Sequence, residues 1–367
     1  MAKSQKRLII FMPSIDGGGV EKNLFIISNF LSKKLSDVVI ITFDKRFNSK
    51  FNKQIKIINA IQKIDKNYSK YFKYYKCLKI LISEIKKKET LVLAFQANIY
   101  CCLLSLIFNF NLITRSNSSP SGWSKNFFKN LIFKFLLKIP KKVIVNSRDF
   151  KIEIDKKFNI KSKLIYNPLN IDTIKSKSKE KLSLNFFNNS RIKAINIARF
   201  TDQKDHLTLL KSIKYLVKEK LKIKLLIIGY GPNKNNILNY IKKNKLSKFV
   251  KIIKFQNNPY KYIQKSNLFI LSSLYEGLPN VLLEAMSLKK FVISSDCPTG
   301  PKEILKNGKY GILFNPGDKK DLSSKIMNYH NHKKKYDKII LKAYNSLDRF
   351  DFKTNCEKYL NVIEEFI

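Results

Sequence analysis

Residues 268–295 read LFILSSLYEGLPNVLLEAMSLKKFVISS, and they carry the clearest indication of the fold class. Leu268–Ser272 and Phe291–Ser295 are short apolar runs of the kind that form buried strands. A helix over Asn280–Leu288 fits between them, entered through a turn that contains glycine and proline. A strand, a helix and a second strand in this order predict two parallel strands joined by a crossover connection.

The same alternation continues along the rest of the chain. In the second half, we expect further strands at Ala194–Ala198, Leu225–Gly229 and Val250–Phe255, and a helix over His206–Glu219. The first half alternates likewise, with expected strands at Arg7–Met12, Val38–Phe43, Leu91–Phe95, Leu112–Thr114, Val143–Asn146 and Lys163–Tyr166. The pattern predicts an α/β protein of two doubly wound domains facing a cleft, with ligands at the carboxyl ends of the strands.

A change of composition marks the expected boundary between these domains. From Asn167 to Asn189 the chain is rich in Lys, Ser and Asn and has little periodicity, as in an interdomain linker. We therefore expect a first domain at residues 1–168, a linker at 169–190, a second domain at 191–345 and a C-terminal helix within 346–367.

Composition excludes several classes of protein. The 367 residues are 44% hydrophobic with only 11 glycines and 10 prolines, which excludes a disordered or fibrous chain. The net charge is +45, from 72 Lys+Arg against 27 Asp+Glu, and it indicates an anionic partner such as nucleic acid, a membrane surface or a phosphorylated substrate. An AT-rich coding sequence is the alternative source of the many lysines, although it explains the scarcity of acids less easily.

Cysteine content and one uncharged segment bear on the compartment. The five cysteines are odd in number and form no CxxC pair, and three histidines add no zinc pattern, so we expect a reduced, cytoplasmic protein.

Leu91–Thr114 has no charged residue and is long enough to cross a bilayer. We favour the alternative in which it divides into a strand, a core helix over Ala97–Phe108 and a second strand, because polar residues fall at the junctions.

Two loops carry residues suited to phosphate. The glycines at 17–19 follow a strand and precede a helix, where they form either a plain tight turn or a phosphate site at the helix N-terminus. Arg199 and Lys204 also lie between a strand and a helix. Two cations in that place suit a diphosphate, although in so basic a chain they are also compatible with solvated surface.

A third motif carries two of the few acids. Glu276 lies in the turn before the helix at 280–288, and Glu284 lies about one helical turn inside it. Carboxylates accept hydrogen bonds from hydroxyl groups, so the pair fits a sugar or ribose. The structural alternative is a helix-capping acid together with a salt bridge.

Taken together, these motifs resemble those of a known family. GGGVE at 17–21, ARFTDQKDH at 198–206, GYGP at 229–232, EGLPNVLLEA at 276–285 and DCPTGPKEIL at 296–305 resemble the family 4 glycosyltransferases, which are retaining enzymes of the GT-B class. The resemblance covers most of the chain and is strongest from Arg199 to Gly317. It implies two Rossmann-like domains, the first binding the acceptor, with the final helix packing back toward the first domain. It also implies a hexosyltransferase-type enzyme of class EC 2.4.

The resemblance implies residue roles as well. Arg199 and Lys204 would hold the donor diphosphate, Glu276 would contact the donor sugar, and Glu284 would accept hydrogen bonds from the ribose. Many members use a histidine of the N-terminal domain, but none precedes His206 here, so Arg115 is the substitute candidate. The expected catalytic residues are Glu276, Arg199, Lys204 and Arg115. The expected donor-binding residues are Gly18, Gly19, Gly229, Gly231, Leu278, Pro279, Asn280 and Glu284. No metal or other cofactor is expected beyond the UDP- or GDP-sugar co-substrate.

Partners follow from the resemblance and from the basic charge. Related transferases build bacterial surface polysaccharide and lipopolysaccharide, so the expected acceptor is a polyprenyl-diphosphate-linked or lipid-anchored glycan. Lys125–Lys138, after Trp123, reads as a basic amphipathic helix, which predicts peripheral binding to an anionic surface on the cytoplasmic face of the inner membrane. Lys70–Lys88 is a second such segment, and its aromatic residues also superficially suggest nucleic-acid stacking, which no RNA- or DNA-binding motif supports. The alternatives are a nucleotide-sugar epimerase of GT-B fold or a basic nucleic-acid-binding protein.

Overall fold

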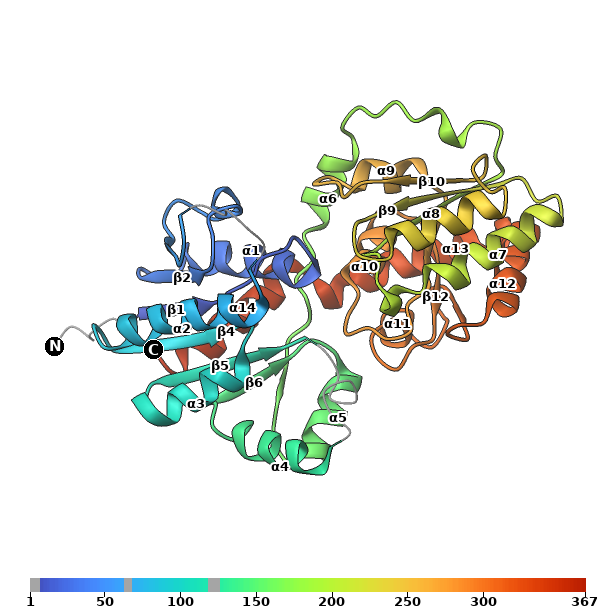
Figure 1. Ribbon diagram of the computed structural model, residues 1–367. Helices are drawn as coiled ribbons and strands as arrows, with labels where there is room; N and C mark the ends of the chain where they lie inside the picture. The colour runs from blue at the N-terminus through green and yellow to red at the C-terminus, as the bar shows by residue number, and fades with distance from the viewer. Residues whose placement is uncertain (1–6, 63–67, 118–125) are drawn as a thin grey trace. The chain divides into compact units, whose positions relative to one another are not determined.

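The chain folds into two compact α/β units. The computed structural model describes residues 7–62, 68–117 and 126–367 (Figure 1). One unit comprises the chain up to Pro168 together with Phe352–Ile367, and the other comprises Leu169–Asp351. Both are doubly wound, which confirms the predicted fold class.

The first unit is built on a parallel sheet. Its described strands lie in the order β3-β2-β1-β4-β5-β6-β7, and every neighbouring pair is parallel. The strands are β1 (Arg7–Phe11), β2 (Val38–Thr42), β3 (Lys56–Asn59), β4 (Thr90–Ala94), β5 (Asn111–Ser116), β6 (Lys142–Val145) and β7 (Lys163–Leu164). The helices are α1 (Gly19–Leu31), α2 (Lys70–Ile85), α3 (Asn98–Phe108), α4 (Phe127–Leu136), α5 (Arg148–Phe158) and α14 (Phe352–Glu364), with the short 3-10 helix η1 (Asn48–Lys50).

Alternation along β1 builds a core on each face of this sheet. Leu8 and Ile10 pack with residues of α1 and α14, whereas Ile9 and Phe11 pack with residues of α2, α3 and α4. Successive side chains of a strand point to opposite faces, so a fully apolar strand is buried on both sides. The helix α14 therefore completes the first unit, although it is the last helix of the chain.

The uncharged segment at 91–114 lies within this unit. It forms most of β4, all of α3 and the first part of β5, and both strands are buried. Asn109 ends α3 in the left-handed conformation that asparagine tolerates. The predicted division into strand, helix and strand is confirmed. None of the described helices is both long enough and apolar enough to cross a membrane.

The second unit contains the stretch that opened the sequence. Its described strands are parallel in the order β10-β9-β8-β11-β12-β13, and β11 and β12 pair in register from Leu268↔Phe291 onward. The strands are β8 (Ile192–Ile197), β9 (Ile223–Ile228), β10 (Val250–Ile253), β11 (Leu268–Leu271), β12 (Phe291–Ser295) and β13 (Ile312–Phe314). The helices are α6 (Ile171–Ser178), α7 (His206–Lys218), α8 (Lys234–Lys243), α9 (Tyr260–Lys265), α10 (Asn280–Ser287), α11 (Pro301–Ile304), α12 (Lys319–Asn331) and α13 (Lys333–Asn345), with 3-10 helices η3 (Asn185–Phe187), η4 (Asp202–Lys204) and η5 (Ser346–Phe350).

The expected linker at 169–190 differs from the structure. These residues belong to the second unit and include α6, which Asn170 caps by accepting a hydrogen bond from the Thr173 amide at 2.9 Å. Ile174 is buried, and α6 packs against α9 and α10. An eight-residue helix with so few apolar side chains is too short to give a clear periodic signal, which is why the segment read as a linker.

Candidate functional site

Two of the motif loops meet at the carboxyl edge of the second sheet. The strand order reverses between β8 and β11, and ligands of doubly wound sheets bind at such a point. The Leu274 amide donates to the Gln203 carbonyl at 2.8 Å, and the Ser272 hydroxyl donates to the Lys204 carbonyl at 2.9 Å. The loop after β8 and the loop after β11 are therefore joined through their backbones.

Lys204 and Glu276 form an ion pair within this joined structure. Lys204 Nζ lies 2.5 Å from Glu276 Oε1, and the two side chains are only 14% and 8% exposed. The same carboxylate oxygen accepts a hydrogen bond from Ser273 Oγ at 2.6 Å. Limited access of water leaves such a pair weakly screened. The structure thus brings together two predicted residues that lie 72 positions apart in the chain.

Three hydroxyl groups that the sequence analysis gave no role position Glu276. Thr299 Oγ1 donates to the backbone carbonyl of Glu276 at 2.5 Å, and Ser295 Oγ donates to the carbonyl of Ser273 at 2.6 Å. Ser273, Ser295 and Thr299 are all buried. The signal for Ser273 and Ser295 in the sequence is that small hydroxyl residues follow or end the apolar runs of β11 and β12, and Thr299 lies in the DCPTGPKEIL motif.

Arg199 is placed differently from Lys204, although both follow β8. Its side chain is exposed, and no described residue forms a hydrogen bond or ion pair with its guanidinium. A guanidinium at the carboxyl edge of a strand can bind two oxygens of a phosphate at once. The loop therefore presents one exposed cation and one cation held by a carboxylate.

Close backbone packing explains the nearby glycines. A Cβ on Gly229 would lie 2.0 Å from the carbonyl oxygen of Ala198, and one on Gly231 would lie 2.5 Å from that of Phe200. A Cβ on Gly300 would lie 1.8 Å from the Gly277 carbonyl oxygen. These glycines bring neighbouring loops into contact, and the predicted placing of Gly229 and Gly231 beside a nucleotide base stays a prediction.

The residues expected to bind the donor around α10 are mostly buried. Leu278 and Pro279 are buried where the chain enters the helix, and Asn280 is its first residue. Glu284 is 3% exposed, and its Oε1 accepts a hydrogen bond from the Tyr260 hydroxyl at 3.4 Å. The start of α10 thus presents its amide end at the edge of the sheet, whereas the carboxylate of Glu284 lies inside.

Two titratable side chains nearby are neutral at physiological pH. Burial lowers the pKa of His206 to about 4, and the Lys204 charge adds to the effect. Burial raises the pKa of the Cys297 thiol to about 12, and the charge of Glu276 adds to this. Cys297 is therefore no thiolate nucleophile. Among the described residues, no three His, Cys, Asp or Glu side chains group as metal ligands, and the expectation of a metal-free site stays a prediction.

The glycine loop of the first unit forms a tight turn. Gly18 is the N-cap of α1 and Gly19 its first residue. A Cβ on Gly18 would lie 2.7 Å from Glu21 Oε2, and Glu21 Oε1 accepts from the Asp16 amide at 3.4 Å. Glu21 already places a carboxylate in the first turn of α1. The protein's own carboxylate therefore lies at the start of α1, as expected for a plain tight turn. The expected closure of Gly18 and Gly19 on a donor diphosphate stays a prediction.

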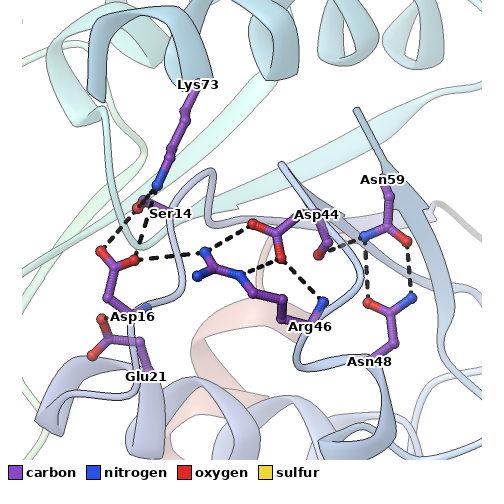
Figure 2. Close-up of polar contacts among 8 residues, drawn as sticks. All are labelled: Ser14, Asp16, Glu21, Asp44, Arg46, Asn48, Asn59 and Lys73. Carbon is purple, nitrogen blue, oxygen red and sulfur yellow. Dashed lines mark hydrogen bonds and ion pairs between the residues drawn. The ribbon is translucent and has the colours of Figure 1, made fainter. Parts of the chain in front are cut away.

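A polar cluster that the motifs did not include lies beside this loop. Figure 2 shows Arg46 and Lys73 converging on Asp16, which is half exposed, at 3.8 Å and 3.9 Å. Lys73 Nζ also donates to Ser14 Oγ at 3.4 Å, and Arg46 pairs with Asp44 at 2.9 Å. Ser14 and Asp16 follow β1 and Asp44 and Arg46 follow β2, so the cluster lies at the carboxyl edge of the first sheet. Polar residues after the first two apolar strands were its signal in the sequence.

Arg115 has structural partners. The side chain is fully buried, Nε donates to the Tyr359 hydroxyl at 2.7 Å and Nη2 donates to Asn167 Oδ1 at 2.7 Å. Nη1 donates to Asn117, and the guanidinium lies 5.1 Å from the centre of the Phe95 ring. All three guanidinium nitrogens therefore bond the protein itself, and the predicted substitution of Arg115 for a catalytic histidine stays a prediction.

The fold and this site define a class. Residues 178–346, most of the second unit, match the family model described as glycosyl transferases group 1. The crystal structure of HepE from Anabaena in complex with UDP is similar, with a TM-score of 0.80 at 16% identity over 98% of this chain and 100% of that one. The architecture is GT-B, and residues 178–346 are similar to the glycosyl transferases group 1.

Two curated relatives extend the match. An uncharacterized glycosyltransferase of Methanocaldococcus jannaschii is 38% identical over 205 residues, which are 51% of this chain and 50% of the relative. This chain thus covers about half the length of that relative. The N-acetylgalactosamine-N,N'-diacetylbacillosaminyl-diphospho-undecaprenol 4-alpha-N-acetylgalactosaminyltransferase of Campylobacter jejuni is 27% identical, over 84% of this chain and 86% of the relative.

Proposed function

We propose that this protein transfers a sugar from a nucleotide-sugar donor to a glycan acceptor, with retention of configuration at the anomeric carbon. The observation that carries the proposal is the pairing of Lys204 with Glu276 at the switch point of the second sheet. Arg199 lies exposed in the same loop as Lys204. The match to group 1 glycosyl transferases and the UDP bound to HepE support a nucleotide-sugar as the donor.

In the proposed reaction, the bond between the anomeric carbon and the diphosphate oxygen breaks, and the acceptor hydroxyl bonds to the same face of the sugar. The hydroxyl proton passes to the leaving phosphate oxygen. Arg199 and Lys204 offset the charge that develops on the nucleotide diphosphate. Glu276 orients Lys204 and accepts a hydrogen bond from a hydroxyl of the donor sugar, so the protein supplies binding and electrostatics rather than a nucleophile.

Other residues of the second unit would hold the rest of the donor. The backbone of Leu278, Pro279 and Asn280 would lie against sugar and phosphate, where the amide end of α10 favours negative charge. Glu284 would accept from the ribose hydroxyls, and Gly229 would border the base of a UDP- or GDP-sugar. Engagement of Glu284 requires the ligand to reach a carboxylate that is buried without it.

The proposed acceptor is a polyprenyl-diphosphate-linked glycan in surface polysaccharide or lipopolysaccharide synthesis. The name of the Campylobacter jejuni relative, which includes an undecaprenol-linked substrate, supports this choice. The first unit would bind the acceptor at the cluster of Asp16, Arg46 and Lys73, since a carboxylate between two cations can meet both hydroxyl and phosphate groups. Such an acceptor would bring the enzyme to the cytoplasmic face of the inner membrane as a peripheral protein.

A thermal-shift screen over UDP-, GDP- and ADP-sugars tests the donor, followed by transfer assays with the sugar that stabilises the protein. Glu276→Ala is expected to abolish transfer in a folded protein, and proton NMR of the product is expected to show the anomeric configuration of the donor. A folded Glu276→Ala variant with unchanged kcat would overturn the assignment. Donor isomerisation without acceptor would indicate an epimerase, and stabilisation by oligonucleotides but by no nucleotide would indicate nucleic-acid binding.

A further inference from the structure

Exposed apolar side chains of the described chain gather on three helices of the first unit. Eleven of the 20 large hydrophobic residues that are exposed among the described positions lie on α2, α3 and α4, which hold only about a tenth of those positions. An even distribution over the described positions would place only about a tenth of these exposed hydrophobic residues on the three helices. They are Tyr71, Phe72, Tyr75, Tyr100, Leu103, Leu106, Ile107, Phe128, Leu131, Ile132 and Phe135.

These helices form one continuous surface, here called the α2–α4 face. All three contribute buried residues to the same core on one side of the sheet. The rings of Tyr74 in α2 and Tyr100 in α3 lie 6.0 Å apart, Lys86 Nζ lies 5.5 Å from the ring centre of Phe108, and α3 contacts α4. The exposed residues of α3 were expected to be core from the sequence. The structure buries only one side of that helix, including Cys101 and Cys102, and exposes Ile107 to 71%.

The charges on the α2–α4 face have one sign. Exposed lysines lie among the apolar residues, at positions 70, 76 and 79 of α2 and 129 and 134 of α4. Lys76 and Lys79 hold their ammonium groups 5.6 Å and 4.8 Å from the ring centres of Phe72 and Tyr75. The single acid within the three helices, Glu84, is buried and paired with Arg7 and Lys87.

We propose that the α2–α4 face binds an anionic lipid bilayer. Aromatic and aliphatic side chains would enter the interfacial region, and the lysines would meet lipid headgroups, as in interfacial amphipathic helices. A second copy of this face is a poor partner, because it would bring lysine against lysine. Nucleic acid would pair with the lysines but leave Leu103, Leu106 and Ile107 without apolar contacts. The predicted helix at Lys125–Lys138 is one part of the surface, and Trp123 and Lys125 lie outside the described residues.

The α2–α4 face would be the surface by which the enzyme meets the membrane. This rests on the proposed function in one respect, namely that the membrane carries the acceptor. Vesicle binding needs neither donor nor acceptor, so the two proposals can fail separately. Nucleotide-induced thermal shift is measured on the same preparations. A preparation that binds vesicles but no nucleotide would contradict the proposed function alone. A preparation that binds nucleotide but no vesicles would contradict only the membrane role of the α2–α4 face.

The experiment is cosedimentation of the full chain with vesicles of phosphatidylcholine, with and without phosphatidylglycerol. Wild type is expected to bind only the anionic vesicles and to be released by salt. The test variant replaces Lys76, Lys79, Lys129 and Lys134 by Gln. Because each lysine near an anionic surface contributes on the order of 1 kcal/mol, or about fivefold in partition, the loss of four lysines should weaken binding on the order of a thousandfold. The control makes the same change at four exposed lysines of the second unit, Lys234, Lys242, Lys243 and Lys248, and keeps wild-type binding.

A second variant tests the apolar contribution at constant charge. Ile107→Ser, Leu131→Ser and Phe135→Ser together should weaken binding at least tenfold, whereas Tyr215→Ser, Leu238→Ser and Leu341→Ser in the second unit should not. Circular dichroism checks folding, and if the apolar variant misfolds, the lysine variant decides. Equal binding to both kinds of vesicle, no binding at all, or equal losses in test and control would overturn the proposal. So would a dimer in sedimentation velocity that the apolar variant dissociates.

Discussion

The ion pair between Lys204 and Glu276 makes a measurable contribution to the stability of the second unit. Glu276→Ala removes a carboxylate oxygen that receives hydrogen bonds of 2.5 Å from Lys204 and 2.6 Å from Ser273. Hydrogen bonds to charged groups contribute about 1.5–3 kcal/mol, and a cation left partly buried adds to the loss. We therefore expect Glu276→Ala or Lys204→Ala to lower the free energy of unfolding by about 3 kcal/mol each.

The double variant measures the interaction between Lys204 and Glu276 apart from the contacts that each makes with other residues. With a coupling energy of about 2 kcal/mol, the double variant loses about 4 kcal/mol where independent sites would lose about 6 kcal/mol. Guanidinium denaturation of the full chain, followed by circular dichroism, gives these values. Hydrogen exchange at residues 198–206 and 272–280 locates the loss in the second unit.

A matched pair on the surface supplies the control. Lys325 and Asp321 lie 3.6 Å apart on α12 with greater exposure, and such pairs contribute less than about 1 kcal/mol. Coupling of Lys204 and Glu276 no larger than that of Lys325 and Asp321 would refute the reasoning, because the pair would then be no more than a screened surface contact. Full transfer activity in either single variant would refute its place in the reaction.

Three further outcomes follow from buried groups and crowded loops. The pKa of His206 is about 4 instead of 6.5, so the unfolded chain takes up the proton first as the pH falls. About 3 kcal/mol of stability, present above pH 6.5, is therefore lost on acidification toward pH 4, and a His206→Leu variant should lack this slope in denaturant midpoints. Gly300→Ala should cost about 3 kcal/mol more than Gly317→Ala, since both have positive φ but only Gly300 is crowded, and equal thermal shifts would contradict this. Arg115→Met should cost about 3–5 kcal/mol in denaturant melts, because it leaves the buried oxygens of Tyr359 and Asn167 without their donor, and Tyr359→Phe should cost about 1.5–3 kcal/mol. An Arg115→Met variant of wild-type stability that has lost transfer would support the predicted catalytic role of Arg115.

The large positive charge divides among different places in the structure. Arg199 and Lys204 lie at the donor edge of the second sheet, and Arg46 and Lys73 lie at the carboxyl edge of the first. The lysines of the α2–α4 face lie among exposed apolar residues. Other exposed lysines, such as Lys234, Lys242 and Lys243 of α8, lie on ordinary solvated surface.

The order of strands and helices and the class of fold could be predicted from the amino-acid sequence alone. Apolar runs such as 268–272 and 291–295, separated by a helix, depend only on neighbours within a few residues, and the uncharged segment at 91–114 was correctly divided for the same reason. The motif order also located Arg199, Lys204 and Glu276 at strand ends. The short helix α6 escaped notice because eight residues give too little periodicity.

Which side chains meet and which face water became visible only in the folded protein. Glu276 meets Lys204 from 72 positions away, and Arg115 is enclosed by Tyr359 from 244 positions away. An apolar helix such as α3 reads as core in the sequence, yet the sheet covers only one of its sides and leaves Ile107 exposed. Burial and pairing depend on elements that are distant along the chain and adjacent in space. Local sequence patterns therefore cannot fix them.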